Sequence, residues 1–117
     1  MGAPVVWFEV AGRDLDTLKS FYETLFGWKV DANNPMEYGM VEGGGIGGGI
    51  TKDDDGSMVT VYVEVPDLQA SLQKAESLGG KTTQPPDQVP GGPMIAQFKD
   101  PAGNTIGLIK SGSMPTG

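Results

Sequence analysis

The chain contains neither cysteine nor histidine. Disulfide bonds are therefore impossible, and the thiolate and imidazole ligands that most transition-metal centres use are missing. The same absence excludes catalytic triads built on a histidine base or a cysteine nucleophile. Any catalysis has to come from Glu, Asp, Tyr or Lys side chains.

Long apolar runs and clusters of basic residues are also missing. No stretch approaches the roughly 18 apolar residues that a membrane-spanning helix needs, and no basic-then-apolar leader is found. Fifteen acidic residues against eight basic ones give a net charge of −7, and the basic residues are scattered, which disfavours nucleic acid as a partner. We therefore expect a soluble, cytoplasmic protein that binds neither nucleic acid nor membranes.

What is present is a repeated pattern, once in residues 5–27 and again in residues 60–80. Each copy opens with β-branched and aromatic residues, continues after a loop with apolar residues at helical spacing, and ends in glycine. Asp14 and Asp67 stand where each helix begins and can cap its first turn. Three short strand-like runs follow each helix, at 28–31, 37–41 and 48–52 in the first copy and at 81–83, 94–99 and 105–110 in the second.

These patterns predict an α+β fold of two tandem βαβββ units. We expect a single domain over residues 1–117, with one module at about 4–52, a second at about 58–110 and a tail at 111–117. The helical spacing predicts buried faces formed by Leu15, Leu18, Tyr22 and Leu25 and by Leu68, Leu72, Ala75 and Leu78. Residues rich in Pro, Asn, Asp and Gly predict turns at 33–35, 53–56, 85–87 and 100–104.

Three motifs together resemble the vicinal oxygen chelate superfamily, which includes glyoxalase I, bleomycin resistance proteins and extradiol dioxygenases. They are Trp7-Phe8-Glu9-Val10, Phe21-Tyr22 leading to Leu25-Phe26-Gly27-Trp28, and Asp100-Pro101-Ala102-Gly103-Asn104. The resemblance covers about residues 4–110. It implies paired βαβββ modules whose mixed sheets curl around a cavity, and a homodimer.

The resemblance also places the ligands of the metal-dependent members on this chain. On the first strands they would fall at Val5 or Trp7 and at Thr60, and on the last strands near Gly49 and at Gly107. Apart from the weak hydroxyl of Thr60, none of these side chains can coordinate a metal, and an all-carboxylate Mg²⁺ or Ca²⁺ site would need acids from elsewhere. We therefore predict no metal and no other cofactor.

Strand alternation puts Trp7 and Glu9 on one face of the first strand and Thr60, Tyr62 and Glu64 on the matching face of its repeat. If these faces line the cavity, two aromatic–Glu pairs provide a stacking wall with two anionic groups. The alternative is that these faces are exposed to solvent and that their aromatic side chains have no binding role. Glu9 and Glu64 are the candidate catalytic pair, because a carboxyl in a partly apolar cavity has a raised pKa. The candidate ligand-binding set is Trp7, Glu9, Thr60, Tyr62, Glu64, Gly49 and Gly107.

The glycine-rich run at 43–49 contains a G-x-G-x-x-G match. No helix pattern follows it, so it is not a dinucleotide-binding fingerprint. Two interpretations stay open: a hairpin whose missing side chains let a ligand approach the backbone, and a loose turn.

Together these observations predict a glyoxalase- or bleomycin-resistance-like protein that binds a small organic ligand in a metal-free cavity, for sequestration of a drug or metabolite. The alternative is a metal-independent isomerase or lyase with Glu9 or Glu64 as general base next to a carbonyl group. Without a metal or histidine to stabilise an enolate, a lone carboxylate supplies only part of the rate enhancement such an enzyme needs. A purely structural or protein-interaction module is the third class.

Overall fold

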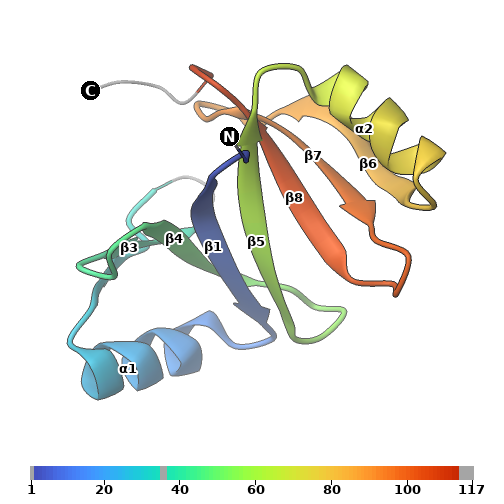
Figure 1. Cartoon of the computed structure of the whole chain (residues 1–117). Helices are drawn as coiled ribbons and strands as arrows, with labels where there is room; N and C mark the ends of the chain where they lie inside the picture. The colour runs from blue at the N-terminus through green and yellow to red at the C-terminus, as the bar shows by residue number, and fades with distance from the viewer. Residues whose placement is uncertain (1, 35–36, 114–117) are drawn as a thin grey trace. The chain divides into compact units, whose positions relative to one another are not determined.

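The computed structural model describes residues 2–34 and 37–113, and both predicted βαβββ modules are present in these residues (Figure 1). The chain divides into two compact units. The first unit is Val6–Val61, and the second unit runs from Tyr62 onwards and includes the N-terminal segment up to Val5. The predicted α+β class, with a helix and mixed strand pairing in each module, is confirmed.

The first module contains β1 (Val5–Gly12), α1 (Leu15–Phe26), β2 (Lys29–Asp31), β3 (Gly39–Glu42) and β4 (Gly47–Lys52). Its strands lie in the order β2-β3-β4-β1. β1 is parallel to β4, and β3 is antiparallel to both of its neighbours. This pairing places β4, the glycine-rich strand, directly beside β1.

The second module contains β5 (Met58–Val65), α2 (Leu68–Ser77), β6 (Lys81–Gln88), β7 (Met94–Lys99) and β8 (Thr105–Lys110). Its strands lie in the order β5-β8-β7-β6. β5 is parallel to β8, and β7 is antiparallel to β8 and β6. The sequence of parallel and antiparallel pairs repeats that of the first module, as the internal repeat predicted. None of the helices in the described part of the chain has the length and apolarity that crossing a membrane requires.

Both helices begin at the predicted caps. The Asp14 carboxylate accepts a hydrogen bond from the backbone N–H of Thr17 at 3.1 Å, and this bond lowers the pKa of Asp14. Asp67 accepts in the same way from Ala70 at 3.0 Å. α1 ends at Gly27, whose φ of 74° is the left-handed conformation that glycine adopts without strain.

Each helix packs on strands of its own module, α1 on β2 and β4 and α2 on β6, β7 and β8, and each unit has its own core. In the first unit the buried residues are Val30, Val41 and Ile50, with Phe8, Val10, Leu15, Leu18, Tyr22 and Trp28 packed against them. In the second unit they are Val65, Leu68, Leu72, Ala96 and Leu108, joined by Val63, Met94 and Phe98.

The predicted buried faces are wrong for the last turn of each helix. Leu25 is 57% exposed and Leu78 is 69% exposed. After α1 the packing continues instead through Trp28, on which Tyr22 stacks with ring centroids 5.8 Å apart, whereas Phe26, whose ring is 6.0 Å from that of Tyr22, is itself 55% exposed. Helical spacing alone did not show which side chains at the end of the helix are packed.

The turn predicted at 85–87 is also wrong, because these residues belong to β6. β6 is the terminal strand in the order of its sheet, where a proline needs no ladder partner for its missing N–H. The pairing with β7 shifts register between Thr82 and Gln84 and again between Gln84 and Asp87, so both prolines lie in an irregular stretch. Of the turn predicted at 33–35, Pro35 lies outside the described residues.

The turn predicted at 100–104 is present. The Asp100 carboxylate accepts hydrogen bonds from the backbone N–H groups of Ala102 and Asn104, both at 2.9 Å, and from the Asn104 side chain at 2.9 Å. These bonds lower the pKa of Asp100, and the bond from the Asn104 side chain has the largest effect. Gly103 has a φ of 92°, which explains why glycine stands at this position.

Candidate functional site

The two faces of β1 have different surroundings. Phe8 and Val10 pack into the core of the first unit with the side chains of α1. Trp7 and Glu9 alternate with them and therefore lie on the opposite face. On this face the neighbours of Trp7 and Glu9 across the parallel ladder are Gly47 and Gly49 of β4, which have no side chains to cover them.

Tyr38, which directly precedes β3, connects Trp7 and Glu9. Its hydroxyl donates a hydrogen bond to Oε2 of Glu9 at 2.8 Å and accepts one from Nε1 of Trp7 at 3.1 Å. All three side chains are half-buried. The result is a continuous chain of hydrogen bonds from an indole through a phenol to a carboxyl group.

The side chain of Asn34 holds the backbone of Tyr38. Its Nδ2 donates to the Tyr38 carbonyl at 2.7 Å, and its Oδ1 accepts from the Tyr38 N–H at 3.0 Å. Between them, Glu37 adopts a φ of 51°, the left-handed region that non-glycine residues seldom occupy. Asn34 therefore fixes the direction in which the Tyr38 side chain leaves the loop.

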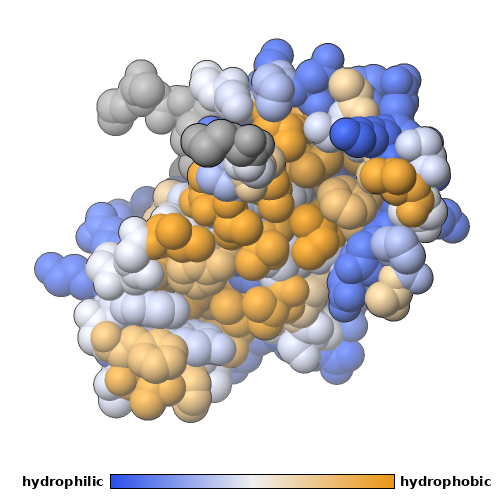
Figure 2. Space-filling model, viewed as in Figure 1, coloured by the Kyte–Doolittle hydropathy of each residue, from blue (hydrophilic) through white to orange (hydrophobic). Residues whose placement is uncertain are grey.

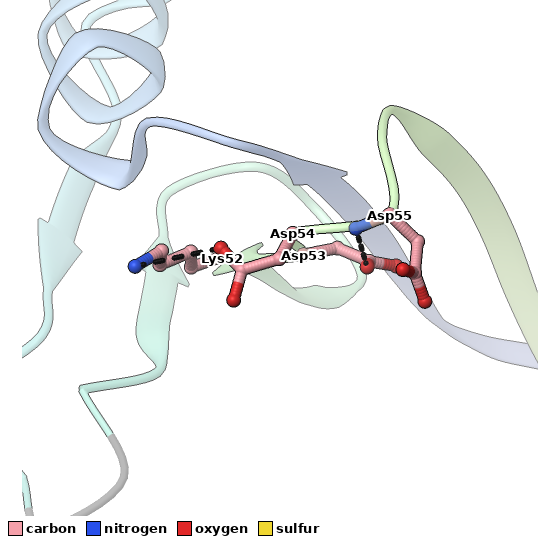
Figure 3. Close-up of polar contacts among 4 residues, drawn as sticks. All are labelled: Lys52, Asp53, Asp54 and Asp55. Carbon is pink, nitrogen blue, oxygen red and sulfur yellow. Dashed lines mark hydrogen bonds and ion pairs between the residues drawn. The ribbon is translucent and has the colours of Figure 1, made fainter.

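Burial raises the pKa of Glu9 above its ordinary value, because the charged carboxylate loses hydration on this face. The hydrogen bond from Tyr38 lowers the pKa and so opposes part of this effect, while the negative charge of Asp53 raises it further. Asp53 follows β4, and its carboxylate accepts from the N–H of Asp55 at 2.9 Å (Figure 3). Nearby, Lys52 pairs with Asp54 at 3.5 Å rather than with Asp53 (Figure 3).

Aromatic side chains pack directly against the backbone of the glycine-rich strand at Gly47, Gly48 and Gly49. A Cβ added to Gly47 would come within 2.6 Å of the Trp7 ring, and one added to Gly49 would lie 2.0 Å from the Tyr38 hydroxyl. On the other face, a Cβ at Gly48 would lie 2.1 Å from the ring of Phe8. The loose-turn interpretation is therefore wrong for 47–49, which belong to β4. The side chain of Tyr38 therefore covers the backbone of Gly49 on this face.

The second unit also places an aromatic ring against a strand glycine, but the hydrogen-bond partner of its tyrosine is a glutamine. Tyr62 pairs with Gly107 across β5 and β8, and a Cβ added to Gly107 would lie 2.4 Å from the Tyr62 ring. Nε2 of Gln97 donates to the Tyr62 hydroxyl at 3.0 Å, and half-buried Glu64 pairs with Ile109.

The strand pairings also show which glycines of the two modules are equivalent, and they differ from the expected pair. Because Trp7 pairs with Gly47 as Tyr62 pairs with Gly107, the counterpart of Gly107 is Gly47, two residues before the expected Gly49. The glycine-rich run allowed several alignments, and only strand register chooses among them.

Two site residues, Tyr38 and Gln97, were missed from the sequence. Both lie on strands or loops that are distant in sequence from their partners, Tyr38 by 29 residues from Glu9 and Gln97 by 35 from Tyr62. The available signal was an aromatic residue, Tyr38, in the predicted strand 37–41 that precedes the glycine-rich run in the sequence. It did not specify which tyrosine would face Glu9.

The remaining predicted residues lie apart from this chain of hydrogen bonds. Thr60 is 2% exposed, and its Oγ1 has no hydrogen-bond partner within the described parts of the chain. Val5 is 46% exposed. Glu9 belongs to the first unit and Glu64 to the second, so a cavity shared by both stays a prediction.

Comparison with known proteins places the fold in a family. Residues 5–108 match the family model of the Glyoxalase/Bleomycin resistance protein/Dioxygenase superfamily. Because the match covers most of the chain, the protein belongs to this superfamily, as the sequence motifs predicted. Among curated relatives, the anthracycline biosynthesis protein DnrV of Streptomyces peucetius is 28% identical over 142 residues, an alignment that covers 97% of this chain. The chain spans 48% of that relative, about half its length.

Solved structures share the fold at low sequence identity. The Mn(II)-bound glyoxalase from Novosphingobium aromaticivorans matches with a TM-score of 0.70 and 15% identity, covering 97% of this chain and 40% of that one. Methylmalonyl-CoA epimerase from Mycobacterium tuberculosis matches with a TM-score of 0.63 and 17% identity, covering 94% and 92%. At these identities the likeness concerns the fold alone.

The Mn(II) of that glyoxalase makes a metal the first group to test against this chain. With no histidine or cysteine available, three or more acidic side chains would have to converge, and no such group exists among residues 2–34 and 37–113. The donor set on the described strands therefore does not fit a metal ion, since the positions concerned carry Val5 or Trp7, Thr60, Gly107 and, by strand register, Gly47.

Proposed function

We propose that the protein binds a small organic molecule on the face of β1 that carries Trp7 and Glu9, without a metal ion. The observation that supports this most directly is the half-buried carboxyl of Glu9, hydrogen-bonded to Tyr38 and flanked by an indole. An aromatic wall beside one partly desolvated acid is the composition typical of small-molecule sites. Sequestration of a drug or metabolite is the role we infer.

The charge of Glu9 defines which ligands we expect. When ionised, it attracts a cationic or hydroxyl-bearing ligand and repels a carboxylate, and the aromatic side chains favour a ligand with a ring. The other residues that we expect to take part in ligand binding are Thr60 and Gly49 of the first unit and Tyr62, Glu64 and Gly107 of the second.

Calorimetric titration with phenethylamine tests this proposal, with 3-phenylpropionate as the anionic control of similar shape. We expect the amine to bind and the acid not to bind. Glu9→Gln preserves the shape and removes the charge, so affinity for the amine should fall by roughly 1.5–3 kcal/mol, the scale of a charged hydrogen bond. Equal binding of both probes by the parent and by the Glu9→Gln and Glu64→Gln variants would refute the site.

Elemental analysis of the purified protein tests the metal-free part of the proposal. We expect no stoichiometric transition metal, because the positions at which the superfamily's metal ligands would fall carry Val5 or Trp7, Thr60 and glycine. Close to one zinc, nickel, manganese or iron per chain, lost on substitution of Thr60 or Glu64, would contradict it.

A second candidate function is a metal-independent isomerase or lyase in which Glu9 is the general base. The raised pKa of Glu9 favours it, because a base is most effective when its pKa approaches the working pH. The hydrogen bond from Tyr38 would hold the carboxylate in one orientation. Glu64 is the corresponding candidate in the second unit.

Proton exchange separates the two functions. The probe is methylmalonyl-CoA, which is bound in one of the similar solved structures. It carries a hydrogen atom on the carbon next to its carbonyl groups. In deuterated water, NMR should show catalysed loss of that hydrogen with the parent and none with Glu9→Gln. Binding without exchange by any carbonyl probe would leave sequestration as the function.

A further inference from the structure

Tyr38 occupies the position in which a ligand group would meet both Trp7 and Glu9. One oxygen atom, its hydroxyl, receives the indole N–H and donates to the carboxyl group. The oxygen also lies over the bare backbone of Gly49, at the place a side chain would otherwise fill. The protein thus holds a phenol in its own candidate binding site.

We propose that Tyr38 is an internal stand-in for the ligand, and that the site accepts a phenolic hydroxyl, which displaces the Tyr38 ring from Gly49. This inference rests on the proposed function and names its ligand class. Asn34 fixes the backbone of Tyr38 by two hydrogen bonds, so displacement requires rotation of the side chain alone.

The pair of groups around this oxygen selects a hydroxyl. The Trp7 N–H can only donate, and an ionised Glu9 can only accept, so the group between them has to do both. An ammonium group can donate to Glu9 but cannot accept from Trp7, so it satisfies only one of the two groups, and a carboxylate cannot donate to Glu9. A phenol meets both requirements, and its flat ring fits a strand whose Gly47 and Gly49 already lie against aromatic rings.

The test replaces the internal phenol with an added one. Tyr38→Gly removes the side chain, and p-cresol supplies the same ring, hydroxyl and methyl carbon. We expect p-cresol to bind the variant in calorimetry and to raise its melting temperature. Toluene, the matched probe without a hydroxyl, should bind about tenfold more weakly or worse, and adding Glu9→Gln should weaken p-cresol by a similar factor.

Whether the Tyr38 variants bind p-cresol more tightly or more weakly than the parent protein decides between two roles for Tyr38. If Tyr38 competes with the ligand, Tyr38→Gly and Tyr38→Phe both bind p-cresol more tightly than the parent does. If Tyr38 forms part of the wall that contacts a ligand, both variants bind more weakly, and the inference is overturned. Tyr38→Phe keeps the ring in the packing, so it supplies the answer should Tyr38→Gly fail to fold.

The outcome is separable from that of the proposed function. Glu9-dependent binding of phenethylamine, together with no p-cresol binding to the parent or either Tyr38 variant, overturns the phenol inference and leaves the binding function standing. Failure of both probes removes both proposals. Fluorine NMR of the parent labelled with 3-fluorotyrosine should show the Tyr38 resonance shift on p-cresol binding, and an unmoved resonance with bound p-cresol would contradict displacement.

Discussion

Burial of the Glu9 carboxyl couples its ionisation to folding. A carboxyl whose pKa is higher in the folded than in the unfolded protein is stabilising below its ordinary value, here 4.5, and this stabilisation is lost as pH rises through the folded pKa. Glu9→Gln does not ionise and keeps an oxygen that can accept from Tyr38. The unfolding free energy of Glu9→Gln minus that of the parent should therefore become more positive between about pH 4 and about pH 8.

Urea denaturation at the two pH values measures this difference. Glu64→Gln is the matched control, because it removes a carboxylate from the equivalent strand position of the second unit. A pH-dependent difference of equal size in both variants would show that desolvation of Glu9 is not its cause.

Gly48 is the residue at which a single methyl group should be costly. A Cβ there would lie 2.1 Å from the ring of Phe8, which belongs to the core of the first unit, so the ring must move or the strands must separate. We expect Gly48→Ala to lower the unfolding free energy by about 1–3 kcal/mol, the usual cost of overpacking. Gly2→Ala, where nothing lies within 4 Å, should change it by less than about 0.5 kcal/mol in the same denaturation assay. Equal stability of the two variants would mean that Phe8 relaxes freely.

At the scale of elements, the start of α2 depends on one side chain. Asp67 accepts from the N–H of Ala70 and so satisfies a donor that the helix itself leaves unpaired. Asp67→Ala should cost about 1 kcal/mol of unfolding free energy, while Asp67→Asn, which can still accept, should cost a few tenths at most. Urea denaturation followed by circular dichroism measures both. Equal losses would indicate that the charge of Asp67, rather than its capping bond, supports the helix.

At the scale of the whole molecule, apolar side chains left on the surface predict self-association. Phe21, Leu25 and Phe26 of α1 are each more than half exposed, and Figure 2 shows apolar atoms gathered over this helix. Monomeric proteins seldom leave contiguous apolar patches of this kind uncovered. We predict a homodimer, with twice the chain mass of 12.2 kDa in light scattering at micromolar concentration. A monomer under those conditions would refute it.

The sequence by itself determined the elements and their repetition, because these depend on local chemistry. Asp14 and Asp67 cap helices through bonds to residues three positions away, and β7 and β8 have the bounds that alternation predicted. The superfamily followed from motifs that need no tertiary contact. The identity of Glu9 as an acid on a strand face opposite the core was likewise readable from alternation.

Only the tertiary structure decided what surrounds Glu9. Tyr38 reaches it because β3 pairs with β4 and β4 with β1, which brings together residues 29 positions apart in the chain. The same pairing places Gly47 and Gly49 in a strand beneath the rings of Trp7 and Tyr38, where the sequence had left a ligand approach and a loose turn both open. Strand register is set by the summed packing of both faces, and no local pattern in a glycine-rich segment encodes it.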